Sequence, residues 1–137
     1  MTDKLSPARR SANMSRIRSK DSTPEMLVRR LVFKLGYRYR LHRANLPGKP
    51  DLVFPSRKKA VFVHGCFWHQ HQGCREGRTP GSNETYWGPK LQRNVDRDRQ
   101  HEAELRRLGW QVLVVWECQL RDSGTLAQEV GRFLGRV

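Results

Sequence analysis

The chain of 137 residues has no run of apolar residues long enough to cross a membrane, and hydrophobic residues make up only 36% of it. Its first residues, Met1 to Lys4, begin no apolar stretch like that of a secretory signal peptide. Acidic residues are also scarce, with 13 Asp and Glu against 27 Lys and Arg. The sequence therefore argues against a membrane protein, predicts a cytoplasmic location and leaves a modest core for a single domain.

Positive charge dominates the sequence. The formal net charge is +14, and residues 1–43 alone hold twelve Lys and Arg against Asp3, Asp21 and Glu25. Such a surplus is typical of a protein that binds a polyanion, and nucleic acid on the nucleoid is the leading partner. Residues 1–22 are polar and lack strong periodicity, so we expect a basic N-terminal arm, followed by a single domain at residues 23–137.

Hydrophobic periodicity predicts alternating helices and strands. Leu27, Leu31 and Leu35 recur every four residues between Pro24 and Gly36, which predicts a helix that turns these leucines inward. The other expected elements, in chain order, are a strand at 37–41, a hairpin of strands at 52–54 and 60–63, an irregular segment at 65–89, a helix from Pro89 with Leu91, Val95, Leu105 and Leu108 inward, a strand at 110–116 buried on both faces, and a helix at 126–134. This order predicts an α/β fold with helices flanking a mixed central sheet.

The three cysteines are an odd number in a reducing compartment, which favours metal ligation over a disulfide framework. With one histidine they form the set Cys66, His71, Cys74 and Cys118. Three thiolates and one imidazole suit a closed, tetrahedral and structural zinc site that would order the irregular segment. One alternative is that these are ordinary buried cysteines without a metal. Another is that His69, in place of His71, is the fourth ligand.

A second group of residues has the composition of a nuclease site. Asp51 opens one strand of the predicted hairpin and His64 closes the other. This spacing is similar to the Pro-Asp…Asp/Glu-x-Lys nuclease signature, but Phe62 replaces the second acidic residue and His64 replaces the lysine. A carboxylate that holds a hard metal ion and a base that accepts a proton are what phosphodiester cleavage requires. His69 and Glu25 lie near the ends of other predicted elements, and we expect them to meet Asp51 and His64 at one edge of the sheet. Asp51 as a plain turn residue is the alternative.

The hexapeptide His64-Gly65-Cys66-Phe67-Trp68-His69 is the hallmark of the very-short-patch repair (Vsr) endonucleases, and the chain resembles this family along essentially its whole length. The other matching segments are Arg10-Ser11, Asn13-Met14, Leu46 to Asp51, Asn94-Val95, Arg97 to Arg99 and Val115 to Cys118. The resemblance implies a restriction-endonuclease-like fold of the PD-(D/E)xK type. It also implies an enzyme that nicks one strand of duplex DNA on the 5′ side of the thymine in a T:G mismatch, the product of 5-methylcytosine deamination.

The resemblance also implies roles for individual residues. Asp51 would bind Mg²⁺ with help from the backbone carbonyl of Val63, a position where family members often have threonine. His69 would act as the base, while His64 and Glu25 would act through the water shell of the metal. The residues implied to contact or enter the DNA stack are Phe67, Trp68, Trp87, Met14 and Asn13.

Two other functions remain open at the level of sequence. One is a magnesium nuclease of the same fold, of restriction or structure-specific type, that has no preference for mismatches. The other is a zinc-stapled DNA-binding module without catalysis, in which Asp51 and both histidines would be incidental. A hydrolytic zinc enzyme is disfavoured, because all four ligands of the zinc set come from the protein. We expect a monomer, and the resemblance suggests mismatch-repair factors and a DNA polymerase as partners.

Overall fold

The computed structural model describes residues 23–41, 43, 45–72, 74 and 84–136, with the backbone alone described at 84–87. Four strands form one sheet in the order β1 (Arg40–Leu41), β2 (Leu52–Phe54), β3 (Lys59–His64) and β4 (Gln111–Trp116). The β1/β2 and β2/β3 pairs are antiparallel, whereas β3 and β4 are parallel. The predicted mixed sheet is therefore confirmed, while the expected arm at 1–22, with Asn13 and Met14, lies outside the described residues.

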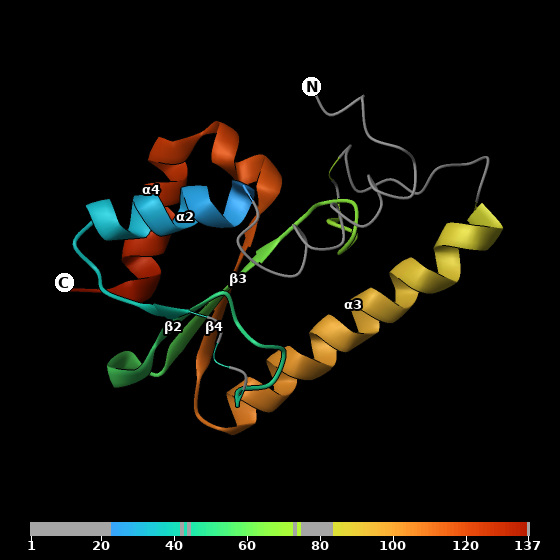
Figure 1. Cartoon of the computed structure of the whole chain (residues 1–137), viewed down its shortest axis with the longest axis horizontal. Coiled ribbons are helices and arrows are strands. Elements are labelled where there is room, and N and C mark those ends of the chain that lie inside the picture. Colours follow the sequence, from blue (N-terminus) through green and yellow to red (C-terminus); the bar gives the residue numbers. More distant parts are fainter. Residues whose placement is uncertain (1–22, 42, 44, 73, 75–83, 137) are drawn as a thin grey trace, which may run out of the picture.

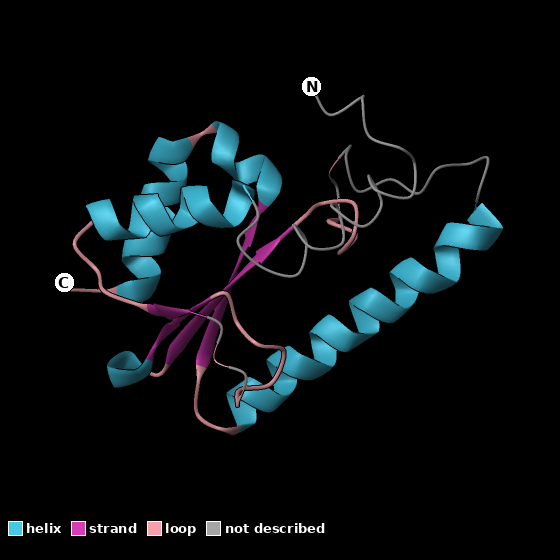
Figure 2. Ribbon diagram, in the orientation of Figure 1, coloured by secondary structure: helices cyan, strands magenta, loops and turns pink. Residues whose placement is uncertain are grey.

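Helices cover both faces of the sheet, as Figures 1 and 2 show. Helices α2 (Thr23–Lys34) and α4 (Ser123–Leu134) pack on one face, where Val28 and Val130 join a cluster with Phe54 and Val61. Helix α3 (Glu84–Arg107) lies on the other face, where Leu105 packs with Val53 and Phe62. Residues that alternate along β2 and β3 thus enter two separate cores, one on each face of the sheet.

The leucine repeat of α2 faces the core only in part: Leu31 and Leu35 are half-buried and pack against it, but they are not its innermost residues. Val28 and Val32 are fully buried against the sheet, whereas Leu27 is 43% exposed. Both sets recur every four residues and are offset by one position, so they form neighbouring stripes on one helix. The compact valines pack on the sheet, which leaves the leucines on the adjoining stripe at the border of the core, with Leu27 exposed.

Several further details differ from the predictions. Only Arg40 and Leu41 of the expected 37–41 strand pair with β2. Helix α3 begins at Glu84 and contains Pro89, which removes one backbone hydrogen bond from a helix of 24 residues without ending it. Leu108 follows the end of α3 and is 57% exposed. The expected burial of β4 on both faces is also wrong: most of the strand is half-buried, with only Val115 fully buried, and β4 lies at the edge of the sheet.

The C-terminus of α4 is held by side chains from the sheet side. The Tyr37 hydroxyl donates to the carbonyl of Gly135, and the Lys59 ammonium donates to that of Phe133. The guanidinium of Arg57, in the short 3₁₀ helix η2 (Pro55–Arg57), donates to the carbonyl of Leu134 at 2.9 Å. These donors satisfy carbonyls that have no partner within the helix, and the two cations also match its negative end.

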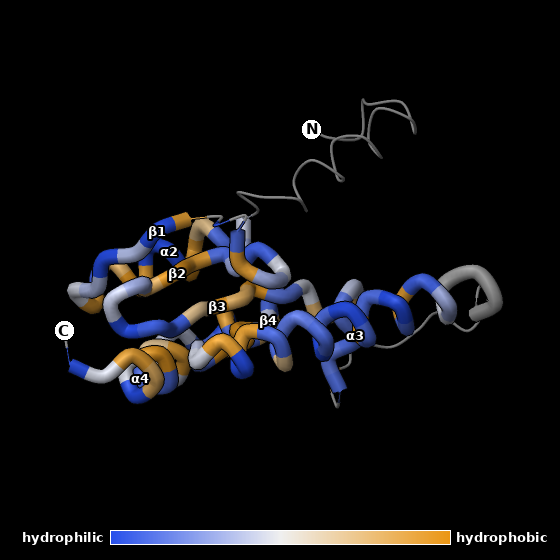
Figure 3. The backbone as a smooth tube through the Cα atoms, turned by 90° about the horizontal axis from the view of Figure 1, so that it is seen from below, coloured by the Kyte–Doolittle hydropathy of each residue, from blue (hydrophilic) through white to orange (hydrophobic). Residues whose placement is uncertain are grey.

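Hydropathy follows this layering. In Figure 3 the tube is hydrophobic through β2, β3 and the inner side of α4, whereas α3 is mostly hydrophilic along its length. Among the described residues, no helix combines the length and apolar character that a membrane span needs. The hydrophilic helix borders the edge of the sheet at which β3 and β4 end.

Candidate active site

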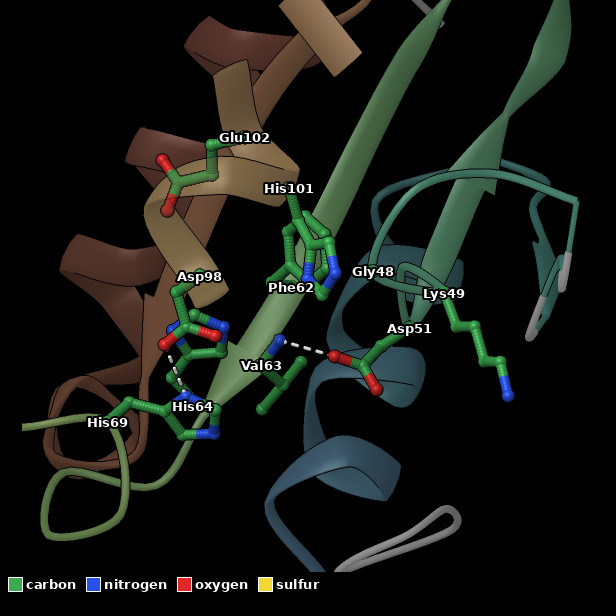
Figure 4. A pocket seen from close by; sticks show the side chains of 10 residues that line it. All are labelled: Gly48, Lys49, Asp51, Phe62, Val63, His64, His69, Asp98, His101 and Glu102. Carbon is green, nitrogen blue, oxygen red and sulfur yellow. Dashed lines mark hydrogen bonds and ion pairs between the residues drawn. The ribbon is translucent and has the colours of Figure 1, made fainter. Parts of the chain in front are cut away.

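The predicted catalytic residues meet at this edge of the sheet. Because β2 and β3 are antiparallel, Asp51, immediately before β2, and His64, at the end of β3, lie at the same end. A pocket of about 230 Å³ opens here. It is lined by Gly48, Lys49, Asp51, Phe62, Val63, His64 and His69 together with Asp98, His101 and Glu102 of α3 (Figure 4).

Asp51 is held in this pocket by the neighbouring strand. Its Oδ2 accepts a hydrogen bond from the backbone N–H of Val63 at 2.6 Å (Figure 4). Glu25, which is only 3% exposed, shares a hydrogen bond with Asp51 and pairs with Arg29 one turn along α2. The pKa of Asp51 is raised to about 7, mainly by burial and also by the Glu25 carboxyl, while the Val63 N–H opposes both. Two adjoining buried carboxyl groups are a strong attraction for a cation.

The two histidines stack on each other beside Asp51. The ring centroids of His64 and His69 lie 3.8 Å apart, with 6° between their planes. His69 Nδ1 is 2.6 Å from Oδ2 of Asp98, so this carboxylate fixes the orientation of the ring (Figure 4). Burial lowers the pKa of His64 to about 3, and the adjacent His69 lowers it as well. His64 is therefore neutral at physiological pH, and the ring nitrogen of His69 that does not contact Asp98 remains available to a substrate.

The loop that carries Asp51 packs closely on α3. Gly48 has a φ of +76°, and a Cβ there would lie 2.9 Å from both Cβ and Nδ1 of His101. Lys49 follows with a φ of +48°, and its side chain points away from Asp51 (Figure 4). Both backbone conformations disfavour ordinary residues, and only glycine avoids the contact at position 48. The absence of a side chain at Gly48 thus lets His101 of α3 pack directly on the loop that carries Asp51.

The four predicted zinc ligands also meet in the structure. One donor atom from each of Cys66, His71, Cys74 and Cys118 lies within 4.8 Å of the others. His71 Nδ1 is 3.7 Å from Sγ of Cys66 and 3.5 Å from Sγ of Cys118. Tetrahedral zinc bonds to sulfur and nitrogen imply a separation of about 3.6 Å between such ligands, so the set fits the ion. Burial raises the pKa of Cys66 to about 12, so a metal that takes this thiolate displaces its proton.

Trp116 lies between this cysteine cluster and the nuclease pocket. The His71 ring stacks on its indole with centroids 4.2 Å apart and 7° between the planes. His64 contacts the same indole edge-on, at 5.2 Å. His64 and Trp116 are also partners in the β3/β4 register. The metal-binding cluster and the pocket therefore share one aromatic side chain.

The aromatic loop residues are partly buried beside the pocket. Phe67 and Trp68 meet edge-on, with centroids 5.1 Å apart. The Asn94 side chain of α3 donates to the Trp68 carbonyl at 3.0 Å, which fixes this loop to the helix. The backbone of Trp87 belongs to α3, but its side chain lies outside the described part of the chain. The packing of Phe67 and Trp68 leaves their predicted role in DNA binding untested.

The sequence analysis brought together Asp51, His64, His69 and Glu25, but it missed the contribution of α3. Asp98, His101 and Glu102 are half-buried and line the pocket. Burial raises the pKa of Glu102, and the nearby Asp98 adds to this shift, while Arg106 opposes it. A signal was present in the spacing, because residues three and four positions apart share one face of a helix. Whether this face of the helix points to the site or to solvent could not be predicted without the position of α3 against the sheet.

Comparison with known proteins gives one consistent family. The chain matches the Vsr family, described as DNA mismatch endonuclease Vsr, over residues 2–75. It is 53% identical over 134 residues to the type II nicking enzyme V.XorIIP of Xanthomonas oryzae pv. oryzae, covering 98% of each chain. It is 40% identical over 129 residues to the DNA mismatch endonuclease Vsr of Escherichia coli K12, covering 94% of this chain and 82% of that one.

A solved structure shares the fold. The catalytic domain of the homing endonuclease I-Bth0305I aligns with a TM-score of 0.57 at 20% identity, over 82% of this chain and 94% of that one. The mixed sheet with flanking helices is thus an endonuclease-like fold. The family match and the two relatives favour an enzyme over a non-catalytic DNA-binding module. The chain belongs to the Vsr family and is a DNA mismatch endonuclease.

Proposed function

We propose that this endonuclease nicks one strand of duplex DNA on the 5′ side of the thymine in a T:G mismatch. The observation that carries the proposal is that the Asp51 carboxyl, which shares a hydrogen bond with the buried Glu25, lines one pocket with the His69–Asp98 pair. This combination supplies acidic metal ligands and a proton acceptor within one small space. Mismatch repair in a very short patch is the corresponding cellular role, with a DNA polymerase and mismatch-repair factors as further partners and the nucleoid as its location.

Mg²⁺ is the proposed catalytic cofactor, held by Asp51 and the backbone carbonyl of Val63. When bound, it supplies Lewis-acid stabilisation of charge on the scissile phosphate. The fit rests on the raised pKa of Asp51, because a cation at this edge offsets the burial of its charge and the proximity of Glu25. Glu25 and His64 would then orient water molecules around the ion. Val63 offers no hydroxyl, so only its main chain is available for this role.

His69 is the proposed general base. Its contact with Asp98 holds the ring and stabilises the imidazolium that forms when the free nitrogen takes a proton from water. His64 stays neutral and stacks on His69, which restricts rotation of that ring. The proton acceptor thus lies beside the carboxyl pair rather than above an open surface.

A structural zinc ion is proposed for Cys66, His71, Cys74 and Cys118. All four positions of a tetrahedral ion would be filled by the protein, so the ion would hold the loop after β3 to the end of β4 and take no part in catalysis. The DNA contacts proposed from the family are Phe67, Trp68, Trp87, Met14 and Asn13. Aromatic wedges suit a mismatch, because a mismatched pair is easier to unstack than a matched one.

The test is nicking of end-labelled duplexes that differ at one pair, T:G or T:A, with Mg²⁺ added or omitted. We expect magnesium-dependent nicking of the thymine strand in T:G duplexes and little with T:A. Asp51→Asn should abolish nicking and keep DNA binding. Trp68→Ala should reduce the preference for T:G more than it reduces overall binding, with Gln72→Ala in the same loop as control. Equal cleavage of both duplexes by the parent enzyme would favour a nuclease without mismatch preference.

A further inference from the structure

Leucines of α2 line a groove on the opposite face of the sheet from α3. Leu27 and Leu31 contribute to it, together with Phe33, and Tyr39, Leu41 and Leu120 line the rest. Its volume is about 970 Å³, roughly four times that of the nuclease pocket. Phe33 is 54% exposed and Leu41 is 40% exposed. This is a large apolar surface for a single small domain, and such surfaces commonly mark binding sites.

The groove is separate from the nuclease pocket. Among the described residues, no side chain lines both cavities. Its walls come from α2, β1, the 3₁₀ helix η5 (Glu117–Arg121) and the start of α4, whereas the nuclease pocket is bordered by α3 on the opposite face. A molecule bound in the groove would therefore leave the substrate edge accessible.

The rim of the groove is positively charged. Arg29, Arg30 and Lys34 line it, and the described part of the lining contains no acidic residue. Arg29 already pairs with Glu25, whereas Arg30 and Lys34 are exposed. The guanidinium of Arg38 lies 4.2 Å from the centroid of the Phe33 ring, which extends the positive potential along the apolar floor. An occupant must therefore combine apolar side chains with negative charge.

This charge argues against two occupants that the chain itself could supply. Residues 1–22 carry six Lys and Arg against Asp3 and Asp21, so the arm is repelled by the rim. A second copy of the chain carries a net charge of +14 and is also repelled. DNA matches the charge, but phosphates would leave the leucine floor in contact with water. The remaining fit is a partner protein.

We propose that the groove binds an acidic amphipathic helix of another protein. Leu27 and Leu31 are one turn apart on α2 and form a ridge, and the facing wall is again helical at η5 and α4. Leucines at helical spacing on the ligand pack between such ridges, while glutamates on its flanks reach Arg30 and Lys34. The nuclease would thereby be tethered to a partner while it remains on DNA.

The test uses a fluorescein-labelled peptide of about 16 residues, with leucines along one helical face and glutamates on both flanks. Binding to the full-length chain is followed by fluorescence anisotropy. Leu27→Ser/Phe33→Ser and Arg30→Glu/Lys34→Glu should each weaken binding by about 10-fold or more. The control is Arg107→Glu/Arg132→Glu, which reverses two exposed charges outside the groove and should change affinity less than about 2-fold.

Thermal melting confirms that each variant is folded, and nicking of a cleavable duplex should match the parent in all of them. A scrambled peptide of the same composition should bind at least about 10-fold more weakly than the designed one. Equal binding of both peptides, or no effect of the groove variants, overturns the proposal. The proposal is also overturned if the peptide does not bind and the groove substitutions instead weaken binding of a matched duplex or of phosphatidylglycerol vesicles. That result would make the groove a nucleic-acid or lipid surface.

Discussion

The imidazole of His71 lies flat on the indole of Trp116, with ring centroids 4.2 Å apart. The same indole meets His64 edge-on in the nuclease pocket. The cysteine cluster therefore reaches the catalytic edge through a side chain that ligates nothing itself. Trp116 therefore packs against both His71 and His64, and His64 in turn stacks on His69, so a change of the Trp116 side chain is expected to affect the packing of all three histidines.

Replacing this shared ring should slow catalysis without removing the metal. Trp116→Leu retains the four cysteine and histidine ligands, so zinc content should stay near that of the parent. His64 and His69 lose a packing surface, and kcat should fall by roughly 10- to 100-fold, since small displacements of catalytic groups are costly. Trp116→Phe restores a ring and should recover most of the rate. Elemental analysis measures the zinc content and single-turnover nicking measures the rate. A Trp116→Leu enzyme that loses its zinc would contradict a role of Trp116 in packing the histidines alone.

The His69–Asp98 contact should shape the pH profile of nicking. Asp98→Asn removes the charge that stabilises the imidazolium, so kcat should fall by about 10²-fold, within the usual contribution of general base catalysis. The dependence of nicking on pH should change as well, because the charge beside the proposed base is lost. Asp96→Asn lies on the exposed side of the same helix and serves as the control. An Asp98→Asn enzyme with the parent's pH profile would remove Asp98 from the mechanism.

Asp51 should make the protein less stable as pH rises. Its pKa is about 7 in the folded chain and 3.8 when unperturbed, so the folded state binds the proton more tightly between these values. Stability contributed by the protonated form is present at low pH and is lost as pH increases towards 7. Asp51→Asn should therefore exceed the parent in unfolding free energy by on the order of 2 kcal/mol at pH 8 and by less at pH 5.

Urea unfolding without added magnesium measures this difference. His64 shifts in the opposite sense, with a pKa of about 3 against 6.5, and costs stability as pH falls below 6.5. That effect is common to both proteins and cancels in the comparison. Added Mg²⁺ should stabilise the parent at pH 8 and leave Asp51→Asn unchanged. A pH-independent difference between them would show that the Asp51 carboxyl is not proton-linked to folding.

Loss of a cysteine should destabilise the loop after β3 more than it affects the chemistry of the folded fraction. Cys118→Ser removes one ligand and also the tie between β4 and that loop. A loss of about 3 kcal/mol corresponds to a fall in Tm of roughly 10 °C in a chain of this size. Gln72→Ser changes an exposed residue of the same loop and should leave Tm and zinc content unchanged. Retention of a full zinc equivalent by Cys118→Ser would argue against its role as a ligand.

The sequence predicted most of the architecture, because its strongest signals are local. The hairpin at 52–54 and 60–63, the following helix–strand order and the gathering of Cys66, His71, Cys74 and Cys118 are confirmed by the structure. Which stripe of α2 faces the sheet was not predictable, since the leucine and valine stripes have the same period. The place of Asp98 in the site depended on how α3 crosses the sheet, which is a long-range packing choice. The metal identities, the roles of the site residues and the preference for T:G stay predictions.

Tyr37, Arg57 and Lys59 fasten the final turn of α4 at the beginning of β3, whereas His64 ends the same strand at the catalytic edge. The strand between them spans six residues, or roughly 20 Å in extended form. A linker or surface attachment joined after Gly135 would consequently emerge away from the incoming duplex. Immobilised enzyme or a reporter fused at this point should keep its cutting edge open to substrate.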